Sequence, residues 1–356
     1  MVELSQRKKD ILTIIVETYT ENENLDPIGS SELLKKLGVN VSTATLRNEM
    51  AELEELGYLE KTHTSSGRIP TAKGYRLYFD ELLVLDDLQG ITEFVRSKME
   101  QTKLPKAQAC RKVLEELLNK EELNYSALLL EKTAYNSSIA KIVFVPTNNN
   151  QGVFILVTNR GQIYHNETYI SKNLNIADIE RTVAFFDENF HGLLLNDFKN
   201  ARKIEINNFD FFNYISNSED IVKFVIINLN KLLADKKEII CPYNILKHSD
   251  FSDIRFAQSY LNEINNNNIF QLINFDGEPL PVIGSSNQVN ISVKVASEHN
   301  THNISEENIS LFKNFSSITA YYSTKEGTGA ITVYGPVRMK YKSVIAILSA
   351  IVCNLK

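Results

Sequence analysis

The feature that most constrains the fold is a pair of short helices joined by a tight turn near the N-terminus. Ser30 or Ser31 can cap the first helix, and Gly38 suits the left-handed position that ends it. Ser42 can cap the second helix, which we expect from Thr43 to Leu56. A short helix, a tight turn and a capped helix in this order form a helix-turn-helix pattern.

The second helix of the pair has two different faces. At about 100° per residue, its apolar side chains fall on one side: Leu46, Met50, Leu53 and Leu56. The opposite side carries small and polar residues: Ala44, Thr45, Arg47, Asn48 and Ala51. We therefore expect the apolar side to pack into a core and the polar side to face solvent.

The flanking segments complete a winged helix-turn-helix over residues 1–83. An apolar repeat with helical spacing predicts a helix before the pair, capped by Ser5. After the pair, Tyr58–Lys61 and Arg68–Pro70 predict two short strands around a polar loop, which together form a hairpin, the wing. Thr71 can cap one more helix.

This arrangement suits binding to double-stranded DNA. A recognition helix presents short polar side chains and a bidentate donor to base edges in the major groove. Arg47 can donate to guanine, Asn48 can pair with adenine, and Ala44 can approach a thymine methyl group. Further candidates, which lie at the helix start and on or after the wing, would contact phosphates or neighbouring bases: Ser42, Thr43, Thr45, Lys61, His63, Thr64, Ser65, Ser66, Arg68, Lys73 and Arg76.

The charge distribution fits a specific binder better than a protein that coats nucleic acid. The net charge of the chain is −6, and residues 1–83 hold ten Lys or Arg against fourteen Asp or Glu. Between Lys61 and Phe79, however, there are four basic residues and no acidic one. The sign of the charge therefore changes between neighbouring elements. The alternative interpretation of the same pattern is a protein-interaction module, in which Arg47 is exposed to solvent and contacts no DNA.

Two runs of this region carry a family resemblance. Residues 41–59, VSTATLRNEMAELEELGYL, resemble the recognition-helix segment of the heat-inducible transcription repressor HrcA family. Residues 63–76, HTSSGRIPTAKGYR, resemble the wing and next helix of that family more specifically. Asn274–Gly277 and Gly335–Tyr341 extend the resemblance, more weakly, to essentially the whole chain.

Two departures from the family pattern lie in the C-terminal part. Val295-Ala296-Ser297-Glu298 stands where relatives usually carry a glycine before Ser or Glu, and Lys340 stands where an acid is common. Both positions concern regulation or partner contacts rather than DNA binding.

The resemblance implies a homodimeric repressor of heat-shock chaperone operons of the chaperonin and DnaK type. It would bind an inverted-repeat operator, the CIRCE element, and the GroEL chaperonin would maintain its active form. The implied fold class is α+β: the winged helix-turn-helix is followed by a GAF-like α/β body that carries an inserted dimerisation domain.

The rest of the chain fits this plan. We assign residues 84–150 and 265–356 to the GAF-like domain and 151–264 to the inserted dimerisation domain. Helical periodicity runs from 84 to 123 and is interrupted near Pro105, and it returns in the inserted segment at Ile179–Phe190 and Ile221–Leu233. Alternating or continuous apolar runs predict strands: Ala127–Leu130, Ile142–Val145, Val153–Val157, Gln162–His165, Phe270–Phe275, Val289–Val295, Ser317–Tyr322 and Gly329–Tyr334. A last helix is expected at Lys342–Val352.

The composition argues against a secreted protein, a membrane protein and a metal-binding protein. The three cysteines are far apart, which is typical of a reducing cytoplasm, and no secretory signal is visible. The longest apolar stretch, Val344–Leu355, is too short to span a bilayer, so we expect no membrane partner. His299 and His302 have a ligand-like spacing but lie in a polar segment without cysteines, so we expect no metal and no cofactor.

No catalytic motif is present, and we therefore expect a protein that is not an enzyme. Two alternatives stay open. The first is a winged-helix transcription regulator that senses a small ligand through its GAF-like body. The second is an enzyme with an accessory winged helix, which would require a pocket with converging titratable side chains.

Overall fold

The structure is a computed structural model that describes residues 4–22, 26–38, 41–62, 67–85, 88–132, 137–148, 150–195, 197–198, 218–273, 290–298, 311–324 and 328–355. The chain divides into two compact units. The first combines Met1–Leu129, Lys237–Tyr322 and Ala330–Lys356, and the second consists of Leu130–Lys236 and Ser323–Gly329. Most of the second unit is therefore inserted, in sequence, into the first.

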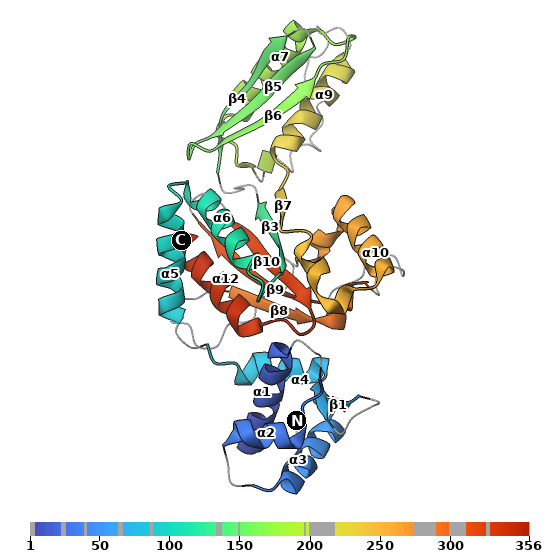
Figure 1. Ribbon diagram of the computed structural model, residues 1–356. Coiled ribbons are helices and arrows are strands. Elements are labelled where there is room, and N and C mark those ends of the chain that lie inside the picture. The colour runs from blue at the N-terminus through green and yellow to red at the C-terminus, as the bar shows by residue number, and fades with distance from the viewer. Residues whose placement is uncertain are drawn as a thin grey trace. The chain divides into compact units, whose positions relative to one another are not determined.

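The N-terminal part of the first unit is a winged helix-turn-helix (Figure 1). Its elements are α1 (Gln6–Glu21), α2 (Ser30–Leu37), α3 (Thr43–Glu55), β1 (Leu59–Lys61), β2 (Arg68–Pro70), α4 (Ala72–Leu77) and a π-helical turn (Tyr78–Leu82). The wing is antiparallel, with Leu59 opposite Pro70 and Lys61 opposite Arg68. These elements confirm the predicted order of helices and strands.

Side-chain caps fix the starts of three of these helices. The hydroxyls of Ser5, Ser42 and Thr71 each accept a hydrogen bond from the backbone N–H three residues further on, as predicted. The predicted cap of α2 by Ser30 or Ser31 is wrong. Gly29 is the extended residue before α2, and Ser30 is already its first helical residue.

The apolar face of α3 is buried as predicted. Its anchoring side chains are at most 2% exposed and share one core with residues of α1: Leu46, Met50 and Leu53 with Ile11, Leu12 and Ile15. Burying such side chains contributes about 1.5–3 kcal/mol each. The helix is consequently fixed from behind, and its orientation in the domain is set by this core.

The body of the first unit is built on a five-stranded sheet with the order β7-β3-β10-β9-β8, in which β8 and β9 are antiparallel. The strands are β3 (Ser126–Lys132), β7 (Lys236–Ile240), β8 (Asn290–Val295), β9 (Phe315–Ser323) and β10 (Thr328–Pro336). Three helices pack together and share the core of the sheet: α5 (Leu88–Gln101), α6 (Lys106–Leu118) and α12 (Tyr341–Leu355) (Figure 1).

The described residues of the body also contain α10 (Ile254–Asn265) and short 3₁₀ turns at Asn244–Lys247, Ser249–Phe251, Asn268–Leu272 and Ala296–Glu298. The predicted strand at Phe270–Phe275 is wrong where the structure describes it. Phe270 and Leu272 alternate as in a strand, but Ile269 between α10 and Phe270 is buried with them. That burial suits a 3₁₀ turn, which puts neighbouring apolar residues into one core.

In its described residues, the second unit has a three-stranded antiparallel sheet covered by the helices α7 and α9. It contains β4 (Ile139–Asn148), β5 (Gln151–Thr158), β6 (Ile163–Tyr169), α7 (Ile176–Phe190) and α9 (Ser218–Leu232), and the strand order is β4-β5-β6. Alternate residues of β5, including Phe154 and Leu156, are buried in a core with α7 and α9. This core is separate from that of the first unit.

The boundaries predicted for the inserted domain, 151–264, differ from those of this unit. A boundary at 150 divides the hairpin of β4 and β5, whose residues pair from Ile139 opposite Thr158 to Asn148 opposite Gln151. At the other end, β7 joins the five-stranded sheet, and the segment after it belongs to the first unit. The inserted unit is therefore Leu130–Lys236, joined by Ser323–Gly329.

Candidate nucleic-acid interface

The outer face of α3 is the candidate interface. Ser42, Ala44, Arg47 and Asn48 are exposed, and Thr43 and Thr45 are half-buried beside them. Leu46, between Thr45 and Arg47 in sequence, is completely buried. The predicted division of the helix into an apolar and a polar face is thus confirmed, and the polar face is accessible in this chain.

The start of α3 is organised by Ser42. Its Oγ accepts a hydrogen bond from the backbone N–H of Thr45 at 3.0 Å and lies 2.9 Å from the Thr45 hydroxyl. The backbone N–H groups of Thr43 and Ala44 stand at the open end of the helix, where the positive end of the helix dipole also lies. Such an end favours an anionic group such as a phosphate.

Arg47 is partly oriented by a neighbouring helix. Its Nε donates a hydrogen bond to the Oγ of Ser30 at 3.2 Å, and Ser30 is the first residue of α2. Asn48 follows Arg47 on the same exposed face. These two side chains are the groups with the hydrogen-bonding capacity to read base edges.

Three acidic residues of α3 are ion-paired with basic residues outside the helix. Arg7 of α1 lies 2.8 Å from Glu49, Lys8 pairs with Glu52, and Arg68 of the wing lies 2.7 Å from Glu54. These pairs neutralise carboxylates of α3, and a net acidic domain can in this way present Arg47 on its outer face. Screening by Arg7, Lys8 and Arg68 lowers the repulsion that the carboxylates would exert on DNA phosphates.

Lys61 and Arg68 of the wing, which were both predicted to contact phosphates, differ in how exposed their side chains are. The side chain of Lys61 is 56% exposed and lies 3.8 Å from Glu54, so it can reach a phosphate. Arg68 is only 7% exposed, and its Nε donates to the same Glu54 carboxylate. Its backbone also bonds to that of Ile28 in both directions. The phosphate role predicted for Arg68 does not fit this burial, and we assign it a structural role.

The tip of the wing lies outside the described residues. It contains four residues that were predicted to contact DNA: His63, Thr64, Ser65 and Ser66. The residue that follows, Gly67, is tightly placed. A Cβ atom there would lie 2.6 Å from the carbonyl oxygen of Pro27, so only glycine fits without a shift.

The two remaining predicted phosphate contacts, Lys73 and Arg76, bond within the protein. The Nζ of Lys73 donates to the carbonyl of Leu56 at 2.6 Å and lies 4.4 Å from the centre of the Tyr58 ring, which holds the end of α3. Arg76 donates from Nε to Glu298 at 2.9 Å and from Nη2 to the carbonyl of Val293 at 2.7 Å. The structure thus brings neither side chain to the polar face of α3.

Sequence reasoning did not select three residues of α2, the helix that packs against α3. Lys35 and Lys36 are exposed on α2, which packs against α3, and the spacing of Leu33 and Leu37 could have placed them on the outer side. Ser30 was taken only as a helix cap. No local signal relates it to Arg47, because the contact depends on how the two helices cross.

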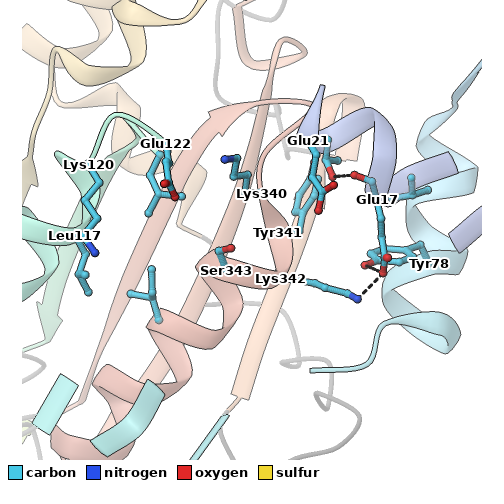
Figure 2. Close-up of a pocket in the computed structure, with 14 residues that line it drawn as sticks. Glu17, Glu21, Tyr78, Leu117, Lys120, Glu122, Lys340, Tyr341, Lys342 and Ser343 are labelled. Atoms are coloured by element: carbon cyan, nitrogen blue, oxygen red, sulfur yellow. Dashed lines mark hydrogen bonds and ion pairs between the residues drawn. The ribbon is translucent and has the colours of Figure 1, made fainter. Parts of the chain in front are cut away.

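A cavity of about 560 Å³ lies elsewhere in the first unit. Figure 2 shows Lys342 and Tyr78 both directed at Glu17, with Lys342 Nζ 2.5 Å and Tyr78 Oη 3.0 Å from that carboxylate. Burial, followed by the proximity of Glu17, raises the pKa of the Tyr78 hydroxyl far above its usual value. The lining mixes lysines with glutamates, of which Lys342 and Glu17 form an ion pair.

Neither a metal-binding cluster nor a membrane-crossing helix occurs among the described residues. Among them, no group of three or more His, Cys, Asp or Glu side chains is placed to hold a metal ion, and His299 and His302 lie outside them. None of the helices within these residues has both the length and the apolar character needed to cross a membrane.

Comparison with known families assigns both parts of the chain. Residues 3–81 match the winged helix-turn-helix transcription repressor, HrcA DNA-binding family, and residues 120–345 match the HrcA protein C-terminal domain. One solved structure, titled a hypothetical protein, aligns over 99% of this chain and 98% of its own, with 19% identity and a TM-score of 0.55. It supports the fold alone. Pseudomonas aeruginosa HmgR aligns with a TM-score of 0.18 at 10% identity, which carries no argument.

The fold and the exposed face of α3 define a winged-helix DNA-binding protein with a larger α+β body. Because the matches to the two family models cover most of its length, the chain belongs to the HrcA family of heat-shock transcription repressors.

Proposed function

We propose that this protein represses chaperonin and DnaK-type chaperone operons by binding, as a homodimer, an inverted-repeat operator of the CIRCE type. The observation that carries the proposal is the exposed pair Arg47 and Asn48 on a helix that is buried along its opposite side. Arg47 reads a guanine and Asn48 an adenine in the major groove, and Ala44 leaves room for close approach.

Phosphate contacts fix the position of the helix on the duplex. Backbone N–H groups at Thr43 and Ala44 meet one phosphate, with the hydroxyls of Ser42 and Thr45 beside them. Lys61 contacts the backbone from the wing, and the wing-tip residues His63, Thr64, Ser65 and Ser66 add contacts there. The exposed Lys35 and Lys36 of α2 are further phosphate contacts. Arg68, Lys73 and Arg76 support the domain instead.

An inverted repeat requires a two-fold symmetric dimer, which places one recognition helix in each half-site. The outer face of the β4-β5-β6 sheet supplies a surface for this. The register places Val145, Val153, Ile155, Val157 and Ile163 on the face opposite the unit's core, and Val145 and Ile163 are 41% and 65% exposed. The same register places the exposed His165 and Glu167 on this face, so its apolar residues form a patch, and such a patch marks a surface that a partner can cover. A second copy of the inserted unit covers it in our proposal.

Regulation follows from the requirement for a folded dimer. Repression scales with the fraction of protein that is folded, dimeric and competent, so heat that depletes this fraction releases the operons. A GroEL-type chaperonin that refolds the repressor restores repression when chaperonin is free. The setting of this cycle is the cytoplasm, where the operons and the chaperonin meet.

DNase footprinting upstream of the chaperone operons of the source genome tests the proposal. We expect protection of an inverted repeat by the wild type. Arg47→Ala should lose about 1–3 kcal/mol of binding free energy and the preference for one base pair per half-site. Arg255→Ala is the matched control, since Arg255 is an exposed arginine on α10 that should leave affinity unchanged. Equal binding by wild type and Arg47→Ala would refute the base-reading role.

A further inference from the structure

Ser30 occupies an unusual place for a serine at the start of a helix. It is 6% exposed and is the first residue of α2, while the capping position belongs to Gly29. Its hydroxyl therefore does not cap α2. It accepts instead from the Nε of Arg47 at 3.2 Å, across the contact between α2 and α3. A buried hydroxyl is thus directed at the side chain that carries the base-reading proposal.

We propose that Ser30 is a positioning residue that determines which edge of the Arg47 guanidinium is presented to DNA. The inference rests on the proposed function, because it concerns the way in which Arg47 reads a base. A guanidinium can bind guanine O6 and N7 in two bidentate ways, through Nη1 and Nη2 or through Nε and one Nη. With Nε bonded to Ser30, only the end formed by Nη1 and Nη2 is available.

The bond also lowers the cost of ordering Arg47 when DNA binds. A long exposed side chain loses much rotamer freedom on forming a fixed contact, and a side chain held in advance loses less. Ser30 lies on α2, whereas Arg47 lies on α3. Base reading by Arg47 therefore depends on how α2 packs against α3, and not on the recognition helix alone.

The test compares single and double variants of the full chain. The probes are the inverted-repeat duplex that the wild type selects from a random library and copies with one base pair changed at a time. Fluorescence anisotropy gives the affinity ratio between the selected duplex and each changed copy. Ser30→Ala should reduce this ratio about tenfold at the base pair read by Arg47 and leave the other positions unaffected. Ser31→Ala, a change at the exposed neighbouring serine, should alter nothing.

The double variant separates positioning from a structural role. If Ser30 acts through Arg47, Ser30→Ala should cost nothing further in the Arg47→Ala background, and Ser30→Thr should restore the ratio. The proposal would be overturned if Ser30→Ala kept the affinity ratio of the wild type. It would also be overturned if the loss of affinity in the double variant equalled the sum of the losses in the two single variants. A wild type that selects no duplex would overturn the proposed function itself, and the positioning role with it.

A measurement on the wild type decides the matter if Ser30→Ala does not fold. In the DNA-free protein, the NMR signal of the Arg47 Nε–H should exchange with water more slowly than that of Arg111. Arg111 is a suitable reference because it pairs with Glu238 through Nη2. Equal exchange rates at the two arginines would overturn the proposal.

Discussion

Arg76 of α4 is ion-paired with Glu298, 222 residues further along the chain. The Nη2 of the same guanidinium donates to the Val293 carbonyl of β8, and its Nη1 lies 3.5 Å from Asp80. The last helix of the winged domain is therefore bonded directly to an edge strand of the five-stranded sheet. Glu298 also accepts from the backbone N–H of Val295, which holds its carboxylate in place.

The pair predicts how Arg76→Ala will behave. The change should lower the free energy of unfolding by about 1–2 kcal/mol, because it leaves the half-buried Glu298 without its partner. Urea unfolding at neutral pH measures this, and Glu298→Gln in a double-mutant cycle isolates the pair. Two results together would contradict this role: Arg76→Ala leaves stability unchanged, and it makes the slope of log affinity against log salt smaller by about one. Arg76 would then contact a phosphate, as the sequence suggested.

The two wing cations that share Glu54 form a matched pair of variants. Arg68→Ala should destabilise the winged domain by about 3 kcal/mol, because it removes the closer and more buried partner of Glu54 and leaves that carboxylate only the exposed Lys61. Lys61→Ala should change stability by less than about 1 kcal/mol, since this partner is exposed. DNA binding should show the reverse order of effects. Lys61→Ala should stay folded and reduce the salt dependence of binding, because it removes a phosphate contact. Equal effects of the two variants on unfolding would contradict this account of Arg68.

Acidification should destabilise the body through His248. Its Nε2 lies 2.9 Å from the carbonyl of Asn124, to which it donates, and its ring stacks on Tyr125. Burial lowers the pKa of His248 below its usual 6.5, against the opposite effect of the Asn124 bond. The unfolded chain then binds more protons as the pH falls through 6.5, so stability is present above that pH and is lost below it.

The urea midpoint measured at pH 8 and at pH 5 tests the role of His248. The wild type should lose stability between these values, and His248→Gln, which keeps a donor for Asn124, should lose less. Identical losses in the two proteins would show that the histidine does not control acid sensitivity.

The proposed dimer surface predicts a change of oligomeric state. Ile163→Asp, at the exposed face of β6, should convert the dimer to a monomer, because it places a charge in an apolar contact. Ile254 provides the control, as it is 69% exposed on α10 in the other unit. Light scattering coupled to size-exclusion chromatography distinguishes the outcomes. A dimer that persists in Ile163→Asp would place the interface elsewhere.

The sequence contained enough local information to predict the winged helix-turn-helix. Caps at Ser42 and Thr71 and the apolar stripe through Leu46, Met50 and Leu53 depend on residues within a few positions of one another. Such short-range patterns determine helices and hairpins directly. The two faces of α3 could be predicted for the same reason.

Features that depend on distant residues could not be predicted in this way. Arg68 and Arg76 resemble phosphate contacts in sequence, and only the fold shows that Glu54 and Glu298 pair with them. The limits of the inserted unit were misplaced because the hairpin at Asn148–Gln151 looks like any other asparagine-rich loop. The 3₁₀ turn at Asn268–Leu272 was mistaken for a strand because short apolar runs fit both.

Site-specific photo-crosslinking tests the central claim most directly, by placing a benzophenone amino acid at position 48 of α3 in the full chain bound to its inverted-repeat operator. We expect crosslinks to one base in the major groove of each half-site, related by the two-fold axis of the repeat. A probe at the exposed position 254 should give none. Absence of crosslinks from position 48, in a complex that still forms, would show that the outer face of α3 does not read DNA.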